Sequence, residues 1–548
     1  DFTEYSLTSM DLRATVTYNA DLGRNGDHIL NLFAGSELNS TDRQQKWFRG
    51  WGYQYSNGGI PFVDYRLFKQ SEEEGTDYYS NSFQYLRNLA YFGMATYSYK
   101  GRYTINGTLR YEGSNMLGKS RQARWLPTWN VSGSWNAHEE NWWAPTFGKA
   151  WTYASLKASY SLTADRGPAS NSLAVFQSFT PWRPSTSANE SAIILAALEN
   201  SELTYEKKHE LNIGVALGFV DNRINVEFDW YRRNNFDLIG YTQTMGVGGV
   251  TTKLANDATM ESTGCEFTIS TTNIKTKDFK WTTDWIFGWA ENTITKLDSR
   301  SQVYSLVNGV GRTEGRPIGA LYSIPFAGLT EEGLPTFFID AEHTQVVGPG
   351  NYADIYFQEY ENIDYLKYEG TIDPKITGSF GNTFSWKGLK LNVFFTYSFG
   401  NVLRLDNLCP VYSSDYSDLT ASMKEMKNRW MVPGDENVTT IPSIPTVRQM
   451  REIDALNNAY SAYNYSTERV AKGDFIRLKE LSLAYDLPKK YFEGQNAVSS
   501  FGVKLSATNL WLAYADKKLN GRDPEYYNTG GVSSPVPRQF TLTVKLGF

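Results

Sequence analysis

The stretch Phe540-Thr-Leu-Thr-Val-Lys-Leu-Gly-Phe548 decides the fold, because a large apolar residue occupies every second position. Phe540, Leu542, Val544, Leu546 and Phe548 share one face of an extended strand, and Thr, Lys and Gly share the other. A strand of a soluble sandwich would solvate its second face with many Lys and Glu residues. An apolar face opposite a small polar face instead fits lipid outside and water inside.

The same alternation recurs upstream, on both sides of short Gly-containing connections that indicate β-hairpins. These runs exceed the five or six residues that are usual for strands of soluble proteins. We therefore predict an all-β fold, a transmembrane antiparallel β-barrel, which closes because hydrocarbon cannot satisfy an exposed strand edge. The clearest paired runs are residues 91–99 with 103–111, 211–219 with 224–230, and 376–386 with 389–399.

Fifteen strands are expected, and the connections between them alternate between short and long. Short periplasmic turns and long extracellular loops are typical of outer-membrane barrels, so the chain should end at the periplasmic rim. Single-chain bacterial barrels have even strand numbers, so an odd number of earlier strands is expected to be missing. The predicted strands lie near 11–19, 28–37, 89–99, 103–113, 127–136, 151–162, 205–219, 223–233, 262–272, 279–291, 375–386, 389–399, 472–486, 500–511 and 538–548.

Composition excludes several other classes of protein. The chain of 548 residues has 16 Trp, 36 Tyr and 30 Phe, too many aromatic residues for a disordered chain. Only Cys265 and Cys409 are present, so no disulfide scaffold is possible. The net charge is -6 without a Lys/Arg-rich run, which argues against a nucleic-acid partner. No apolar run approaches the roughly 20 residues of a membrane-spanning helix.

Several motifs, taken together and in order, resemble the C-terminal part of a SusC/RagA-type TonB-dependent outer-membrane transporter. The resemblance covers essentially the whole chain. It rests on Leu203-Thr-Tyr-Glu-Lys-Lys-His-Glu-Leu-Asn-Ile-Gly214, Asn222-Arg-Ile-Asn-Val-Glu-Phe-Asp-Trp-Tyr231, Glu261-Ser-Thr-Gly-Cys-Glu266, Gly315-Arg-Pro-Ile-Gly-Ala-Leu-Tyr322, Gly473-Asp-Phe-Ile-Arg-Leu-Lys-Glu-Leu-Ser-Leu-Ala-Tyr485, Ala507-Thr-Asn-Leu510, Asp523-Pro-Glu525 and Pro537-Arg-Gln-Phe540.

The resemblance implies a barrel of about 22 strands, a plug, a segment that contacts TonB and a SusD-like surface lipoprotein acting as a lid. Residues 1–548 would be the C-terminal portion of one such barrel, without the plug and the first strands. It also implies the outer membrane of a Gram-negative bacterium, mostly Bacteroidota, and import of oligosaccharides or peptides. The last strand, Phe540 to Phe548, would then be the C-terminal barrel-assembly signal.

Two groups of residues are candidates for contact with a ligand or a plug. The expected connection 38–88 is rich in aromatic residues, and Trp47, Trp51 and Tyr53 beside Arg49 offer flat faces for sugar rings. The alternative is that these aromatic residues pack the loop itself or dock the lid. On the inner face, Asn225, Glu227 and Asp229 would line the substrate path or contact the plug, and we favour the plug.

No catalytic or metal-binding pattern stands out, so we expect no enzyme activity, no cofactor and no metal. Gly113-Ser-Asn-Met-Leu-Gly-Lys-Ser120 matches the phosphate-binding pattern, but a strand rather than a helix should follow, and a surface loop is the favoured interpretation. The four histidines have no metal-ligand spacing. Whether Cys265 pairs with Cys409, and whether a loop binds calcium, stay open.

Three functions remain to be compared. The favoured function is energised nutrient import, in which substrate is captured under the lid and released inward when TonB pulls on the plug. The first alternative is a passive porin or a surface adhesin, which shares the barrel without TonB coupling. The second is a secreted, aromatic-rich carbohydrate-binding protein, which would stay monodisperse without detergent. Glycan and peptide importers share the quoted motifs, so the substrate stays open.

Overall fold

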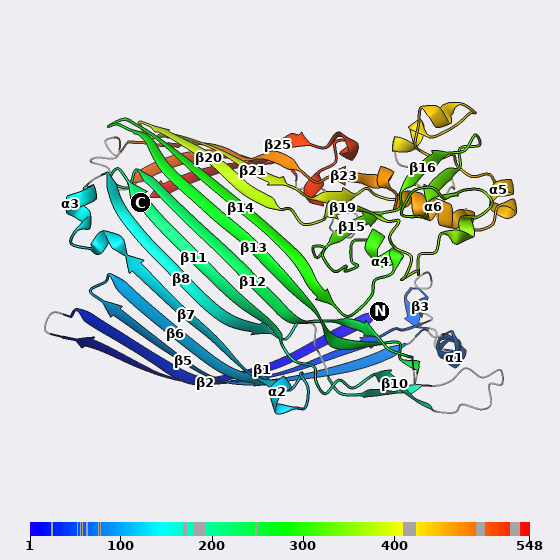
Figure 1. The fold of residues 1–548 in the computed structure, drawn as a ribbon, viewed down its shortest axis with the longest axis horizontal. Helices are drawn as coiled ribbons and strands as arrows, with labels where there is room; N and C mark the ends of the chain where they lie inside the picture. The colour runs from blue at the N-terminus through cyan, green and yellow to red at the C-terminus, as the bar shows by residue number, and fades with distance from the viewer. Residues whose placement is uncertain are drawn as a thin grey trace. The chain divides into compact units, whose positions relative to one another are not determined.

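The fold is dominated by one sheet of 15 strands that follow one another in chain order, apart from the short strands of the connections. The structure is a computed structural model (Figure 1). It describes residues 1–548 except 24–25, 52, 55, 57, 62–63, 75, 77, 149, 168–171, 180–191, 247–248, 409–423, 489–490, 492–498, 527–536 and 548. No helix in this described part is long and apolar enough to cross a membrane.

The strands of the large sheet are antiparallel wherever their register is resolved, and many are very long. Each of β1, β2 and β5 has 21 residues. The sheet consists of β1 (Phe2–Leu22), β2 (His28–Phe48), β5 (Tyr79–Tyr99), β6 (Tyr103–Ser114), β7 (Trp125–Asn136), β8 (Trp151–Asp165), β11 (Glu206–Phe219), β12 (Ile224–Gln243), β13 (Thr252–Lys275), β14 (Phe279–Leu297), β20 (Ile376–Trp386), β21 (Leu389–Phe399), β24 (Phe475–Asp486), β25 (Ser500–Ala515) and β26 (Gln539–Gly547).

Short elements build the connections. The short strands are β3 (Tyr53–Gln54), β4 (Ile60–Pro61), β9 (Val175–Phe179), β10 (Ala192–Ala197), β15 (Ala320–Ser323), β16 (Phe326–Leu329), β17 (Pro335–Phe338), β18 (Val346–Val347), β19 (Lys367–Thr371), β22 (Val402–Arg404) and β23 (Val470–Lys472). The helices are α1 (Tyr65–Glu73), α2 (Arg121–Arg124), α3 (Trp143–Phe147), α4 (Val303–Val307), α5 (Val447–Glu452) and α6 (Leu456–Asn464), and the 3-10 helices are η2 (Ala137–Glu139), η4 (Tyr352–Asp354), η6 (Lys424–Asn428), η7 (Asp435–Asn437), η8 (Thr467–Arg469), η10 (Lys517–Leu519) and η11 (Pro524–Tyr526).

The predicted count of 15 sheet strands is confirmed, whereas several predicted boundaries are wrong. The errors concentrate at the ends that face the long connections. The strand predicted over 28–37 continues to Phe48, and the one predicted over 89–99 begins at Tyr79. These two strands pair along their whole length, from His28 with Tyr99 to Phe48 with Tyr79. The expected connection 38–88 therefore shrinks to residues 49–78.

The chain divides into two compact units, which are described separately below. Unit 1 contains residues 1–136, 157–211 and 233–259, and unit 2 contains residues 137–156, 212–232 and 260–548. The strands of both units carry exposed apolar side chains on one face. In unit 1 these include Leu12, Val16 and Tyr18 of β1, which are 64%, 72% and 58% exposed. Such exposure on a regular face is the pattern expected of strands in lipid.

The last strand shows this lipid face within unit 2. Phe540, Leu542, Val544 and Leu546 are all exposed on one face of β26, as the alternation predicts. They pair with alternate residues of β25, from Phe540 opposite Ala507 to Leu546 opposite Phe501. The side chain of Phe548 lies outside the described residues.

The main apolar core of unit 2 lies in its long connections rather than in the sheet. Buried side chains from the connections 298–375 and 400–474 pack together, among them Phe337, Tyr352, Tyr460 and Tyr463. Figure 1 shows β16 of the first connection beside α6 of the second, and side chains of α4, β15 and α6 share this core. We name the described residues within 303–371 and 402–472 the loop body, which leaves out 409–423.

Candidate functional site

The aromatic residues that the sequence proposes for ligand contact gather around one guanidinium group in unit 1. Arg49 lies over the Trp47 ring at 4.9 Å from its centroid and over the Trp51 ring at 5.3 Å. The same guanidinium donates to the Asp1 carboxylate through Nε at 2.8 Å and Nη2 at 3.2 Å. Arg49 therefore covers one face of each indole ring and also pairs with the Asp1 carboxylate, so the cluster combines cation–π contacts with an ion pair.

The structure corrects the position of this cluster. Trp47 belongs to β2, not to a loop, and pairs with Thr3 on one side and Ser80 on the other. At a rise of about 3.3 Å per residue and a tilt of about 40°, Trp47 lies roughly 50 Å from the turn end of β2. Because the apolar band of such barrels is only about 25 Å tall, the cluster stands outside the hydrocarbon. Tyr53 lies in β3, but its side chain is outside the described part.

The second group, Asn225, Glu227 and Asp229, lies on one face of β12 in unit 2. Glu227 is exposed, whereas Asp229 is half-buried beside Gly214 of β11, where an added Cβ would collide with its carboxylate. Asn225 is exposed and donates through Nδ2 to the backbone oxygen of Asn222 at 3.0 Å. Two carboxylates thus face away from the lipid side.

A half-buried arginine holds the two halves of the loop body together. The Arg404 guanidinium donates to the carbonyl oxygens of Ser466 at 2.9 Å, Val307 at 3.2 Å and Tyr322 at 2.5 Å. It also donates to the Ser323 hydroxyl at 3.1 Å. Burial lowers the pKa of Arg404 to about 10, so the group stays charged at neutral pH. Four acceptors from chain segments far apart in sequence make this arginine the centre of the loop body.

Two buried arginines form ion pairs, one between β24 and the connection from β25 to β26, the other within the connection from β21 to β24. Arg477, only 4% exposed, pairs with Asp523 and at 2.9 Å with Glu525. Arg469, 3% exposed, pairs with Glu425 at 2.6 Å. These arginines were not among the residues that sequence reasoning singled out by role. A signal was present, however, because Arg477 lies in one quoted motif and Asp523 and Glu525 in another, and the two motifs meet here.

The P-loop-like motif builds a turn rather than a phosphate site. Ser120 caps the four-residue helix α2, accepting the backbone N–H of Ala123 at 3.1 Å, and β7 follows at once. Helix α2 has too few turns to supply the aligned N–H groups that bind phosphate. Among the described residues, no group of three His, Cys, Asp or Glu side chains could hold a metal ion. Cys409 is outside these residues, so its pairing with Cys265 stays untested.

Comparison with known proteins finds no matching family model. The TonB-dependent receptor P3 of Formosa agariphila is 26% identical over 100% of this chain and 53% of its own length. The TonB-dependent receptor SusC of Bacteroides thetaiotaomicron is 28% identical over 38% of the chain and 21% of its own length. The RagAB peptide importer in its closed-closed state has a TM-score of 0.76 at 21% identity, covering 100% of this chain and 56% of the other. The chain spans about half the length of the curated relatives that it matches along its whole length.

The lipid-facing strands, the single large antiparallel sheet and this structural likeness define the fold of an outer-membrane β-barrel. The resemblance to SusC/RagA-type TonB-dependent receptors that the motifs predict is confirmed by similarity to TonB-dependent receptors over the full chain and to SusC over 38% of it. The relatives named here are receptors and an importer, not enzymes, in agreement with the sequence prediction.

Proposed function

We propose that this chain is the barrel part of an energised importer that brings oligosaccharides or peptides across the outer membrane. The observation that carries the proposal is the 26% identity to a TonB-dependent receptor over 100% of the chain. Import by a TonB-coupled protein requires a plug, because a barrel this wide otherwise leaves an aqueous lumen. The plug and the TonB-contact segment would belong to the part of the full-length protein outside these 548 residues.

The extracellular face would work with a SusD-like surface lipoprotein that closes over the cargo. The likeness to SusC and to the RagAB importer supports such a partner. A rigid loop body, fixed by Arg404 and by the Arg469–Glu425 ion pair, would give the lid a firm surface to close against. RagAB is named a peptide importer, whereas the name SusC specifies no cargo, so the substrate class of this chain rests on experiment.

The residues proposed from the sequence receive roles within this function. Trp47, Trp51, Tyr53 and Arg49 would contact cargo or lid outside the hydrocarbon. Asn225, Glu227 and Asp229 would contact the plug. The exposed face of Phe540, Leu542, Val544 and Leu546, with Phe548, would be read during barrel assembly.

Uptake by cells tests the function. Cells with the intact gene should accumulate a labelled oligosaccharide or peptide from the co-purifying ligand pool, and loss of TonB should abolish that uptake. Accumulation that persists without TonB would favour the passive porin. A purified chain that stays monodisperse without detergent would instead favour a secreted binding protein.

A further inference from the structure

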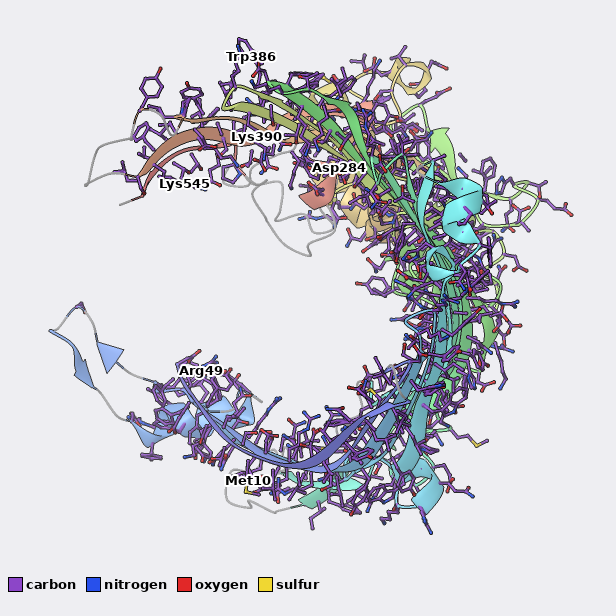
Figure 2. All side chains as sticks on the ribbon, turned by 90° about the vertical axis from the view of Figure 1, so that its left-hand side faces the viewer. Met10, Arg49, Asp284, Trp386, Lys390 and Lys545 are labelled. Carbon is purple, nitrogen blue, oxygen red and sulfur yellow. The ribbon has the colours of Figure 1, made fainter. Side chains whose placement is uncertain are left out.

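Three lysines from neighbouring strands of unit 2 line one polar cavity on the inner face of the sheet. Lys390 lies on β21, Lys504 on β25 and Lys545 on β26. The cavity of about 440 Å³ is also lined by Asn392 and Ser482. Figure 2 shows Lys390 and Asp284 on the side of the strands opposite Trp386, which faces the lipid side. The cavity therefore opens to the interior and not to the membrane.

The lysines are not equally neutralised. Lys504 Nζ lies 3.1 Å from Glu480 Oε1, so this pair is balanced. Among the described residues, neither Lys390 nor Lys545 has a carboxylate within ion-pair distance, although Asp486 also lines the cavity. Both side chains are exposed to the interior, and two ammonium groups side by side on a wall backed by lipid create a positive potential that favours an anion placed between them.

Acidic side chains occupy the same face on other strands of unit 2. Glu227 and Asp229 lie on β12, Glu266 on β13 and Asp284 on β14, where Asp284 accepts a hydrogen bond from the Ser270 hydroxyl at 2.7 Å. Basic residues also lie on these strands, among them Lys280 and Lys296 of β14 and Arg233 of β12, whose charge is balanced by Glu210 at 3.0 Å. The inner face is thus richer in carboxylates on β12 to β14 and richer in lysines on β21 to β26.

The height of the lysine cavity along the barrel axis indicates which part of the protein, cargo or plug, contacts it. Lys390 is the second residue of β21 and Lys545 lies two residues before the end of β26, so both sit near the periplasmic ends of their strands. Cargo captured among the extracellular loops would reach this level last. The full-length relatives carry about as much chain again as the part matched here, enough for a folded body inside the barrel.

We propose that the Lys390–Lys545 cavity binds carboxylates on the surface of the plug, and that the acidic strands bind basic groups on another side of it. The divided wall would then fix the rotational position of the plug in the barrel, because any other rotation places like charges together. This inference rests on the proposed function, which supplies the plug. The plug surface would then carry carboxylates where it meets Lys390 and Lys545, and basic groups where it meets the acidic strands.

Ion conductance through the full-length receptor in planar bilayers tests the proposal. Urea that loosens the plug opens the barrel to ions, so the fraction of open barrels at a fixed urea concentration measures plug retention. The double variant Lys390→Glu/Lys545→Glu should raise that fraction about tenfold, and Lys390→Gln/Lys545→Gln about threefold, as expected for partly exposed ion pairs. High salt should shrink both effects, since it screens exposed charges.

The matched control is Lys296→Glu, which reverses an exposed lysine at the other end of β14, where it pairs with Asp298. This control should leave the open fraction unchanged. Equal opening of the double variants and the wild type would overturn the proposal. So would unchanged opening combined with reduced uptake of acidic cargo relative to neutral cargo, since the lysines would then serve the cargo. A wild-type receptor that conducts without urea would overturn the importer function itself, a result that differs from either of these.

Discussion

Replacing Arg477 with Met should detach the connection between β25 and β26 from the loop side of β24. Arg477 is 4% exposed, and its partner Asp523 has a side chain only 11% exposed, so the pair is shielded from water. Breaking a buried ion pair by removing one member costs about 3–5 kcal/mol. The second partner, Glu525, is 35% exposed and can be resolvated, which argues for the lower end of that range. A loss of about 3 kcal/mol corresponds to a more than hundredfold increase in local opening.

Hydrogen exchange followed by mass spectrometry measures that opening. Backbone amides of η10 and η11 should exchange more than a hundredfold faster in the variant, whereas amides of β17 in the loop body should not change. The matched control is Arg448→Met, because Arg448 and its partner Glu452 are 82% and 59% exposed. An exposed pair at that spacing contributes only about 0.3–0.5 kcal/mol.

Equal exchange rates in the Arg477 variant and the control would refute the idea that burial determines how much an ion pair contributes to stability. The double variant Arg477→Met/Asp523→Leu separates loss of the pair from an unpaired charge. If the cost arises from the stranded Asp523 carboxylate, removing both partners should restore much of the protection. An equally fast exchange in the double variant would mean that packing of the arginine stem dominates.

Three further predictions concern core packing, turn strain and pH. Leu306→Ala, at a fully buried position of the loop body, should destabilise that body by about 2–5 kcal/mol in hydrogen exchange, whereas Val310→Ala, at a position 75% exposed, should have little effect. Gly388→Ala should lower the unfolding midpoint of the barrel in detergent more than Gly101→Ala does. Both glycines have positive φ, but only at Gly388 would an added Cβ meet a backbone oxygen, at 2.5 Å. Equal shifts of the two midpoints would contradict this prediction. Burial alone would raise the pKa of the Asp516 carboxyl, but hydrogen bonds from two backbone N–H groups outweigh it and hold this pKa below its usual value. Protection of η10 from hydrogen exchange should therefore be full above about pH 4 and be lost as the pH falls through the lowered pKa. The Asp516→Asn variant should show no such acid-dependent loss.

The sequence predicted the sheet well wherever one strand face meets lipid. Alternation along 376–386 and 389–399 matches β20 and β21 to the residue, and the Lys387-Gly388 turn lies where expected. The prediction failed where strands leave the hydrocarbon. Residues 39–46 of β2 are polar on both faces, since both faces meet water there, and the period-two signal disappears although the strand continues.

The loop body and its arginines could not be predicted in the same way. Arg404 contacts Val307 and Tyr322, which lie 97 and 82 residues away along the chain, and no local pattern reports contacts over such separations. Trp47 and Arg49 could be predicted as neighbours because they are close in sequence. The ion pair between Arg49 and Asp1 could not, because these residues lie 48 positions apart. The inner-face position of Asp229, in contrast, followed from alternation alone, because neighbours on a strand point to opposite faces.

Arg404 has a consequence for how such receptors diverge. Three of its four acceptors are backbone carbonyls, which every amino acid supplies. Side chains around it can therefore be replaced over generations while the guanidinium keeps the same partners. Selection on the loop surface can then act almost independently of selection for a folded loop, which allows that surface to change while the fold is kept at low sequence identity.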